Sequence, residues 1–207
     1  PNSFKSALIP WLAGIPNRIG YTTELRHLLL TEKYEYKKHE RTMVERYLHL
    51  ANCTYTPQVQ PKLKISDKYQ KSIIRKFNID KSKKIIMLCP DAEFGTAKKW
   101  PVEHWLSLAK LFREQNYSVF FLGKDEGINV HISREEKLND VKSLIGRTSL
   151  LDVVYLLSIS NLTISNDSGL MHIAGSVDSK IIAIYGSSSP IYTPPLISDD
   201  GGEVIYK

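Results

Sequence analysis

Short apolar runs alternate with segments of helical periodicity from residue 84 onward, and this alternation limits the fold more than any other feature of the chain. The candidate strands are 84–89, 117–122, 141–145, 162–165 and 180–185. The candidate helices between and around them are 101–115, 149–158 and 168–175. Strands that alternate with helices and are apolar on both faces form a parallel sheet between two helix layers. With right-handed crossovers, the sequence predicts an α/β fold built on a Rossmann-like, doubly wound parallel sheet.

Local signals place the ends of several helices. Ser149 and Asp152 are three residues apart, which is the spacing of a capping box. Pro101 suits the first turn of the helix that follows it. Ser66 or Asp67 can cap a further helix, whose inner face comprises Tyr69, Ile73, Ile74 and Phe77. Apolar residues also recur at helical spacing over 40–53, whereas residues 1–30 are mixed in character.

The chain divides into two predicted parts. The segment 56–61 contains two prolines and has no periodicity, so we interpret it as a linker between residues 1–60 and 61–207.

Hydrophobic residues make up 42% of the chain and charged residues 24%, which excludes a disordered chain. The longest apolar stretch, 7–15, is interrupted by Pro10 and is much shorter than the ~20 residues of a membrane-spanning helix. Two cysteines exclude a disulfide framework or a cysteine-rich zinc module. The opening Pro1–Phe4 reads like the middle of a longer protein.

Positive charge is concentrated toward the N-terminus. Residues 1–90 contain 17 Lys/Arg and 7 Asp/Glu, whereas residues 91–207 contain 11 and 15. This excess is either an ordinary solvated face or a means of attracting an anionic partner such as a phosphorylated substrate or a membrane surface. No motif typical of proteins that bind RNA or DNA is present, so we expect no nucleic acid partner.

Three loops follow predicted strands, where ligands bind in doubly wound sheets. The first, 90–101, offers the hydroxyl of Thr96, the backbone of Gly95 and the charge of Lys98, which together suit a phosphate. The alternative is an ordinary surface loop with solvated lysines.

The second loop, 165–172, joins a strand to a helix. A helix N-terminus presents free N–H groups and a positive dipole end, which favours anions. Gly169 allows close approach to the backbone, and Ser168 and His172 are four residues apart on one helix face. The alternative is that Asn166 or Asp167 only caps the helix and that His172 is a packed core residue.

The third loop, 185–195, places Gly186 and three hydroxyls, Ser187 among them, after a strand. It suits a phosphate or sugar contact, or it is a plain turn.

The chain has no P-loop, no G-x-G-x-x-G, no Asp-x-Asp pair and no metal-ligand histidine spacing. A nucleotide-sugar site without a metal therefore fits best, with a helix dipole and a lysine charge in place of the cation.

These loops resemble those of the lipopolysaccharide heptosyltransferases, with heptosyltransferase II as the nearest type. The residues that carry the resemblance are Asn166–His172, Tyr185–Pro190, Thr193–Pro195, Pro90–Gly95 and Lys98–Pro101, with Pro1–Leu8 and Ala13–Pro16 in the first part. The resemblance implies a GT-B glycosyltransferase with two Rossmann-like domains. Residues 1–60 would be the end of the acceptor-side domain, and residues 61–207 the donor domain without its final helices.

The resemblance also implies an activity and residue roles. Such enzymes transfer L-glycero-D-manno-heptose from ADP-heptose to the inner core of lipopolysaccharide, with inversion and without a metal or other cofactor. The implied donor-binding residues are Thr96, Lys98, Glu126 (or Asp125, for the ribose), Asp167, Ser168, Gly169, His172 and Ser187. Lys5 would face the acceptor, in agreement with the basic first part of the chain.

The implied general base and its glycine loop would lie upstream of Pro1, so no residue here is assigned that role, and we expect this chain alone to bind the donor without turnover. The implied setting is the cytoplasm of a Gram-negative bacterium, peripherally at the inner face of the inner membrane. The alternatives are a GT-B transferase with another nucleotide sugar and a non-catalytic anion-binding module.

Overall fold

A computed structural model describes residues 2–37, 41–53, 61–93, 96–135, 138, 140–197 and 201–206. The chain forms two compact units, of which unit 1 comprises Pro1–Val59 with Ile191–Pro194, and unit 2 comprises Gln60–Pro190 with Pro195–Lys207. The sequence predicted a single boundary after residue 60, whereas in the structure the distant segment Ile191–Pro194 also belongs to unit 1. Most of the linker predicted at 56–61 lies outside the described residues.

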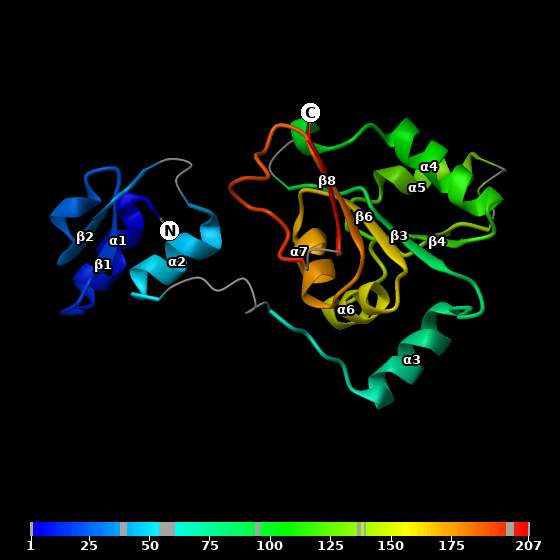
Figure 1. Ribbon diagram of the computed structural model, residues 1–207, viewed down its shortest axis with the longest axis horizontal. Coiled ribbons are helices and arrows are strands. Elements are labelled where there is room, and N and C mark those ends of the chain that lie inside the picture. The colour runs from blue at the N-terminus through cyan, green and yellow to red at the C-terminus, as the bar shows by residue number, and fades with distance from the viewer. Residues whose placement is uncertain are drawn as a thin grey trace. The chain divides into compact units, whose positions relative to one another are not determined.

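Unit 1 contains two helices and a small parallel sheet (Figure 1). Its elements are α1 (Phe4–Leu12), β1 (Ile19–Thr22), the 3-10 helix η1 (Arg26–Leu28), β2 (Glu32–Glu35) and α2 (Met43–Leu50). Strands β1 and β2 pair in parallel, with Ile19 opposite Glu32. Helix α2 starts at a capping box formed by Thr42 and Glu45, which satisfies two backbone N–H groups at its first turn.

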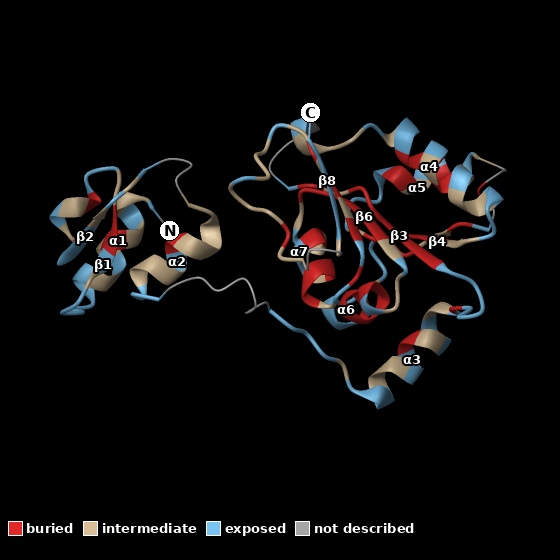
Figure 2. Ribbon diagram, in the orientation of Figure 1, coloured by how far each residue is buried: buried red, intermediate tan, exposed pale blue. Residues whose placement is uncertain are grey.

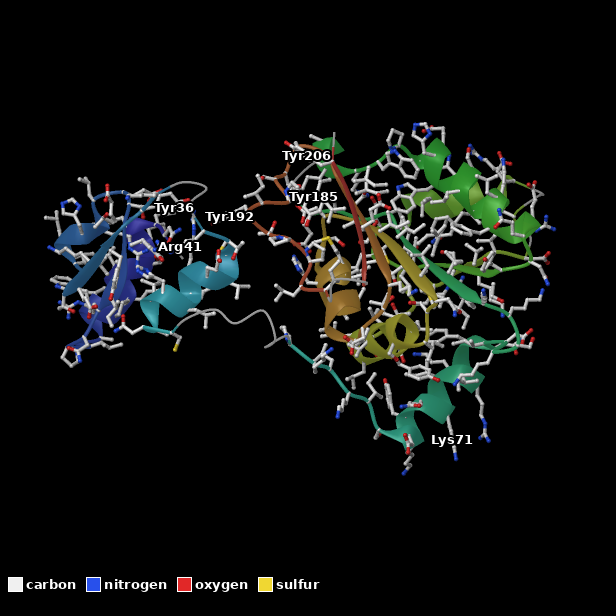
Figure 3. The ribbon with its side chains drawn as sticks, viewed as in Figure 1. Tyr36, Arg41, Lys71, Tyr185, Tyr192 and Tyr206 are labelled. Carbon is white, nitrogen blue, oxygen red and sulfur yellow. The ribbon has the colours of Figure 1, made fainter. Side chains whose placement is uncertain are left out.

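A buried arginine explains why Ile191–Pro194 belongs to unit 1. The guanidinium of Arg46 lies over the rings of Tyr36 and Tyr192, at 4.4 Å and 4.6 Å from their centres, and Figure 3 labels both tyrosines. It also donates a hydrogen bond to the Tyr192 hydroxyl at 3.0 Å, and the backbone N–H of Met43 donates to the Tyr192 carbonyl at 2.9 Å. Cation–π and hydrogen-bond contacts to one residue thus hold this distant segment on α2.

Unit 2 contains a six-stranded sheet in which every neighbouring pair is parallel. The strands are β3 (Ile85–Cys89), β4 (Ser118–Phe121), β5 (Lys142–Ser143), β6 (Leu162–Asn166), β7 (Ile181–Tyr185) and β8 (Gly202–Tyr206). The helices are α3 (Asp67–Phe77), the 3-10 helix η2 (Thr96–Lys98), α4 (Val102–Glu114), α5 (Gly127–Ser133), α6 (Leu150–Ser158) and α7 (Gly169–Ser176). The strand order β5-β4-β3-β6-β7-β8 is that of a doubly wound Rossmann-like sheet, which confirms the predicted fold class.

Helices cover both faces of this sheet, and each face has its own apolar core (Figure 1). On one face, Trp105 and Ala109 of α4 and Ile128 of α5 pack against the strands. On the other, Ile73 of α3 and Met171 of α7 pack with α6. Burial on both faces explains the continuous apolar runs of the central strands, because all five residues of β3 are buried (Figure 2).

Besides the two 3-10 helices, five elements of the described residues were not predicted from the sequence: α1, β1, β2, α5 and β8. Helix α1 contains Pro10, which reads as a break, although Ser3 accepts a hydrogen bond from Ser6 as its N-cap. Strand β2 has the sequence Glu-Lys-Tyr-Glu, and all five residues of β8 are exposed, so neither shows the burial pattern of a strand. Helix α5 has only seven residues.

A buried carboxylate joins α3 to α6 within unit 2. Asp152 of α6 accepts hydrogen bonds from Lys76 at 2.7 Å and Tyr69 at 3.3 Å, and it completes the predicted capping box with Ser149. Burial raises the pKa of Asp152, but hydrogen bonds from Lys76 and Ser149 and the positive charge of Lys76 outweigh it, so the pKa lies below its ordinary value. The carboxylate is therefore ionised and joins the two helices at neutral pH.

Asp152→Ala is expected to lower the free energy of unfolding by about 2–3 kcal/mol, since it removes a helix cap and a charge-assisted hydrogen bond. Because folding lowers the pKa of Asp152, its contribution is present above the unfolded pKa of ~3.9 and disappears as the pH falls through the folded value. Denaturant titrations at several pH values measure both effects. Glu114→Ala, which removes an exposed carboxylate at the last residue of α4, is the control and is expected to change stability by less than ~0.5 kcal/mol. A wild-type-to-variant difference that stays constant in strong acid would contradict this account.

Most of the excess positive charge of residues 1–90 lies in unit 2 and not in unit 1. Unit 1 contains 8 Lys/Arg and 5 Asp/Glu, whereas Lys62–Lys84 of unit 2 contains 9 and 2. The expectation that the basic excess belongs to the first domain is therefore wrong, because most of it lies on and around α3. None of the helices in the described ranges combines the length and apolar character that crossing a bilayer requires.

Candidate functional site

The sheet topology brings the first two predicted loops together. From β3 the chain moves outward through β4 and β5 and then returns to place β6 directly beside β3. The last residue of β3, Cys89, lies opposite Ser165 of β6, so the loops after these strands leave the sheet side by side. This reversal of strand order is the place where doubly wound sheets bind ligands.

Asn166, the last residue of β6, connects the second loop to the first through side-chain hydrogen bonds. Its side chain is fully buried, its amide donates to the carbonyl of Pro90 at 2.6 Å, and its carbonyl accepts from the backbone N–H of Trp100 at 3.3 Å. The sequence suggested at most a helix cap for Asn166, because its partners lie more than 60 residues away in the chain. A polar residue that ends a strand and follows a buried serine was the only local signal. Asn166 fixes the two ends of the first loop, 90–100, against β6.

Lys98 and Asp167 form the central ion pair of the site. Lys98 Nζ lies 2.7 Å from Asp167 Oδ2, and the two side chains are only 24% and 8% exposed. Both residues are among the donor-binding residues that the resemblance implies, and the structure brings them into direct contact. Partial burial strengthens the interaction, because solvent screens it less than it screens a surface pair.

The N-terminus of α7 is open. Ser168 occupies the N-cap position, but its side chain makes no capping hydrogen bond and instead lies 3.2 Å from the Ser165 hydroxyl. Gly169 is exposed, and a Cβ added there would meet nothing within 4 Å. The alternative in which Asn166 or Asp167 caps this helix is therefore wrong. The first-turn N–H groups of α7 lack a side-chain cap, which leaves them suited to an anion.

His172 lies one turn into α7 and is exposed, so the alternative of a packed core histidine is also wrong. Desolvation by the surrounding protein lowers the pKa of the imidazole, and the negative charge of Asp167 opposes this effect. The hydroxyl of Tyr185 at the end of β7 donates to the sulfur of Met171, the residue before His172, at 3.4 Å. Burial and the charge of Asp167 raise the pKa of Tyr185 (labelled in Figure 3). The neutral imidazole can offer one N–H to a ligand at neutral pH.

The third loop packs against the first. A Cβ added at Gly186 would lie 2.6 Å from the carbonyl oxygen of Ala97, so only glycine fits without moving the segment next to Lys98. The backbone N–H of Ser187 also donates to this carbonyl at 3.4 Å, and the Ser187 side chain is exposed. The structure thus gives the third loop a supporting role, with Ser187 at its surface.

The two carboxylates predicted for the ribose have different surroundings. Asp125 pairs with Lys99 at 2.7 Å and accepts the backbone N–H of Gly127; these contacts, led by the Lys99 hydrogen bond, lower its pKa. Glu126 is exposed at the N-cap of α5, with its carboxylate over Gly146. Asp91, which the sequence did not single out, accepts N–H groups from Lys124 and Asp125 and fixes the β4–α5 loop. Glu126 is therefore the carboxylate with fewer contacts to the protein.

The remaining predicted residues lie apart from this cluster or outside the description. Thr96 begins η2, and its side chain and Gly95 are not among the described parts. Lys5 is exposed on α1 of unit 1. A groove of about 330 Å³ lies between the first loop, α4 and α5, where Asp91, Lys99, Trp105 and Asp125 are among its lining residues. Of the predicted donor residues, its described lining includes only Asp125.

The sequence is similar to curated proteins with a known name. It is 39% identical to lipooligosaccharide heptosyltransferase 2 of Haemophilus influenzae over 95% of this chain. It is 37% identical to lipopolysaccharide heptosyltransferase 2 of Escherichia coli, again over 95% of this chain. In both cases the chain spans 61% of the length of the relative.

Solved structures agree with this similarity. The structure of Escherichia coli ADP-heptose LPS heptosyltransferase II matches with a TM-score of 0.86 and 36% identity, over 99% of this chain and 66% of that one. A family 9 glycosyltransferase from Veillonella parvula matches with a TM-score of 0.78 at 19% identity, over 98% of this chain and 60% of that one, which supports the fold. Residues 1–202 match the family described as glycosyltransferase family 9 (heptosyltransferase). The chain therefore belongs to glycosyltransferase family 9.

Proposed function

We propose that the protein containing this chain is a glycosyltransferase that moves L-glycero-D-manno-heptose from ADP-heptose to the inner core of lipopolysaccharide, with inversion. The observation that carries the proposal is the Lys98–Asp167 pair beside the uncapped N-terminus of α7, at the point where the strand order reverses. The names of the curated relatives support the choice of donor and acceptor.

Unit 2 would hold the donor. The diphosphate would accept hydrogen bonds from the free N–H groups at Gly169 and the next residues, with Lys98 supplying positive charge. His172 and Asp167 would meet hydroxyls of the sugar, Ser187 and Thr96 lie in loops at the same end of the strands, and Glu126 would accept a hydrogen bond from the ribose. Since ADP is the leaving group, the same N–H groups and Lys98 would stabilise the charge that develops on its terminal phosphate, in the role a metal has elsewhere.

The acceptor and its setting extend this proposal. Inversion requires a base that accepts the proton of the attacking hydroxyl, and we assign no residue of this chain to that role. Lys5, exposed on α1, would contact the anionic inner core. The acceptor is a lipid, so we propose that the enzyme works in the cytoplasm at the inner face of the inner membrane.

Nucleotide selectivity tests the proposal directly. ADP is expected to raise the midpoint of thermal unfolding of this chain at concentrations where UDP has little effect, because a ligand that binds only the folded state stabilises it. Heptose transfer from ADP-heptose by the protein containing the chain, followed by mass spectrometry of the acceptor, would complete the test. A preference for UDP would overturn the donor assignment, and salt-sensitive anion binding with no nucleotide response would indicate a non-catalytic module.

A further inference from the structure

Unit 2 carries a dense run of exposed positive charge that the donor site does not use. All nine basic residues between Lys62 and Lys84 are exposed, and only Asp67 and Asp80 in this segment are acidic. The segment comprises α3 and the extended chain and turn on either side of it. Its net charge of +7 exceeds that of the whole chain, +6.

Two of these lysines hold α3 in place. Lys76 pairs with Asp152 of α6 at 2.7 Å, and Lys62 pairs with Asp178 after α7. The aromatic and aliphatic residues of α3 face inward, where Tyr69, Ile73 and Phe77 pack on the core. The helix is therefore fastened along its inner face and presents its outer face as a fixed surface.

The other basic residues form what we call the basic face: Lys64, Lys68, Lys71, Arg75, Lys81, Lys83 and Lys84. Lys68, Lys71 and Arg75 are at spacings that put them on one side of α3, and Figure 3 shows Lys71 pointing away from the rest of unit 2. Lys81 lies 5.8 Å from the ring centre of Tyr155. Hydrogen bonds from Ser82 are the main cause that lowers the pKa of the Asp80 carboxyl group, and the positive charge of Lys83 adds a smaller effect in the same direction. Among the described residues, no ion pair joins the basic face to a carboxylate.

The composition of the basic face indicates what it binds. Six of its seven residues are lysines, whose hydrated point charge suits a diffuse layer of anions better than bidentate docking on one phosphate. The aromatic rings of α3 face inward, so the helix offers no platform for stacking nucleic acid bases. Lysines spread over a helix and its flanking segments are typical of surfaces that bind anionic lipid headgroups.

We propose that the basic face docks unit 2 on an anionic lipid bilayer. The choice of a bilayer rests in part on the proposed function, whose acceptor is itself a lipid. Docking through α3 would confine the donor site to the layer of space next to the membrane and raise the effective concentration of a lipid-linked acceptor there. This attraction is electrostatic, so it weakens as salt shortens the Debye length.

Vesicle sedimentation tests the inference with the full chain. The chain is expected to co-sediment with vesicles of phosphatidylglycerol and phosphatidylcholine, but not with phosphatidylcholine alone. Combined replacement of Lys68, Lys71 and Arg75 by Glu is expected to lower the partition coefficient at least about tenfold, since each basic residue near an anionic surface contributes severalfold. Replacement of the same three by Gln, which disturbs the helix less, is expected to cause a smaller loss in the same direction.

The control variant replaces Lys33, Lys37 and Lys180 by Glu, since these exposed lysines lie outside α3 and the change in net charge is the same. It is expected to retain most of its vesicle binding. Equal losses in both triple variants would overturn the assignment to α3, as would binding that survives high salt or tighter binding to a single-stranded oligonucleotide than to vesicles. The thermal shift with ADP is expected to be unchanged in the α3 variants, which separates failure of membrane docking from failure of the proposed donor site.

Discussion

Asp167→Ala is expected to reduce heptose transfer by the protein containing this chain on the order of 100-fold, because a misplaced group at a reacting centre costs about that much. Asp167 is 8% exposed and holds Lys98 Nζ at 2.7 Å, so its removal releases the lysine that we propose contacts the donor. Steady-state transfer rates from ADP-heptose at saturating acceptor measure the effect. The variant is expected to unfold at nearly the wild-type temperature, since the site lies at the edge of the sheet and not in either apolar core.

The matched control is Asp178→Ala, which removes a carboxylate that pairs with Lys62 but is 60% exposed and lies after α7, at the far end of that helix from Asp167. It is expected to leave transfer unchanged, because exposed ion pairs contribute little. His172→Ala is expected to reduce transfer as well, since it removes the imidazole N–H on the same helix. Near-normal transfer in both Asp167→Ala and His172→Ala would contradict the position of the donor site.

The central strands of unit 2 could be predicted because burial leaves a mark in the sequence. Every residue of β3 is buried, so apolar residues run without interruption, and β7 follows the same rule in part. Strand β8 has no buried residue, and β2 consists of three charged residues and one tyrosine. Residue propensity alone therefore could not distinguish either strand from a loop. Strand β1 of unit 1 is held by contacts such as the hydrogen bond from the Tyr21 hydroxyl to the Arg46 carbonyl of α2 at 3.2 Å, which only the three-dimensional structure reveals.

The same distinction applies to the candidate site. Lys98 and Gly169 could each be singled out, because each follows a predicted strand and offers a cation or an accessible backbone to an anion, whereas Asp167 was assigned to the site through the resemblance. That Lys98 contacts Asp167 depends on β6 lying beside β3, and strand order does not follow chain order in a doubly wound sheet. Asn166 and Asp91 act on backbone groups far away in the sequence, so no local pattern predicts their roles.

Lys98→Ala is expected to raise the dissociation constant for ADP at least about tenfold, since a charge-assisted hydrogen bond contributes about 1.5–3 kcal/mol. Lys99→Ala is the matched control: it removes the same charge one residue away, from a lysine that pairs with the 56% exposed Asp125. Its effect on ADP binding is expected to be less than about twofold, because exposed pairs contribute little. Isothermal titration of the chain with ADP measures both constants.

The two lysines separate geometry from overall charge. Both variants lose one positive charge, so long-range attraction of the diphosphate falls equally, and any difference between them reflects the position of Lys98 beside Asp167 and α7. Equal weakening in Lys98→Ala and Lys99→Ala would therefore mean that the loop attracts anions without a fixed contact. If Lys98→Ala bound ADP normally but lost affinity for the lipopolysaccharide acceptor, Lys98 would belong to the acceptor site and the diphosphate would need another cation.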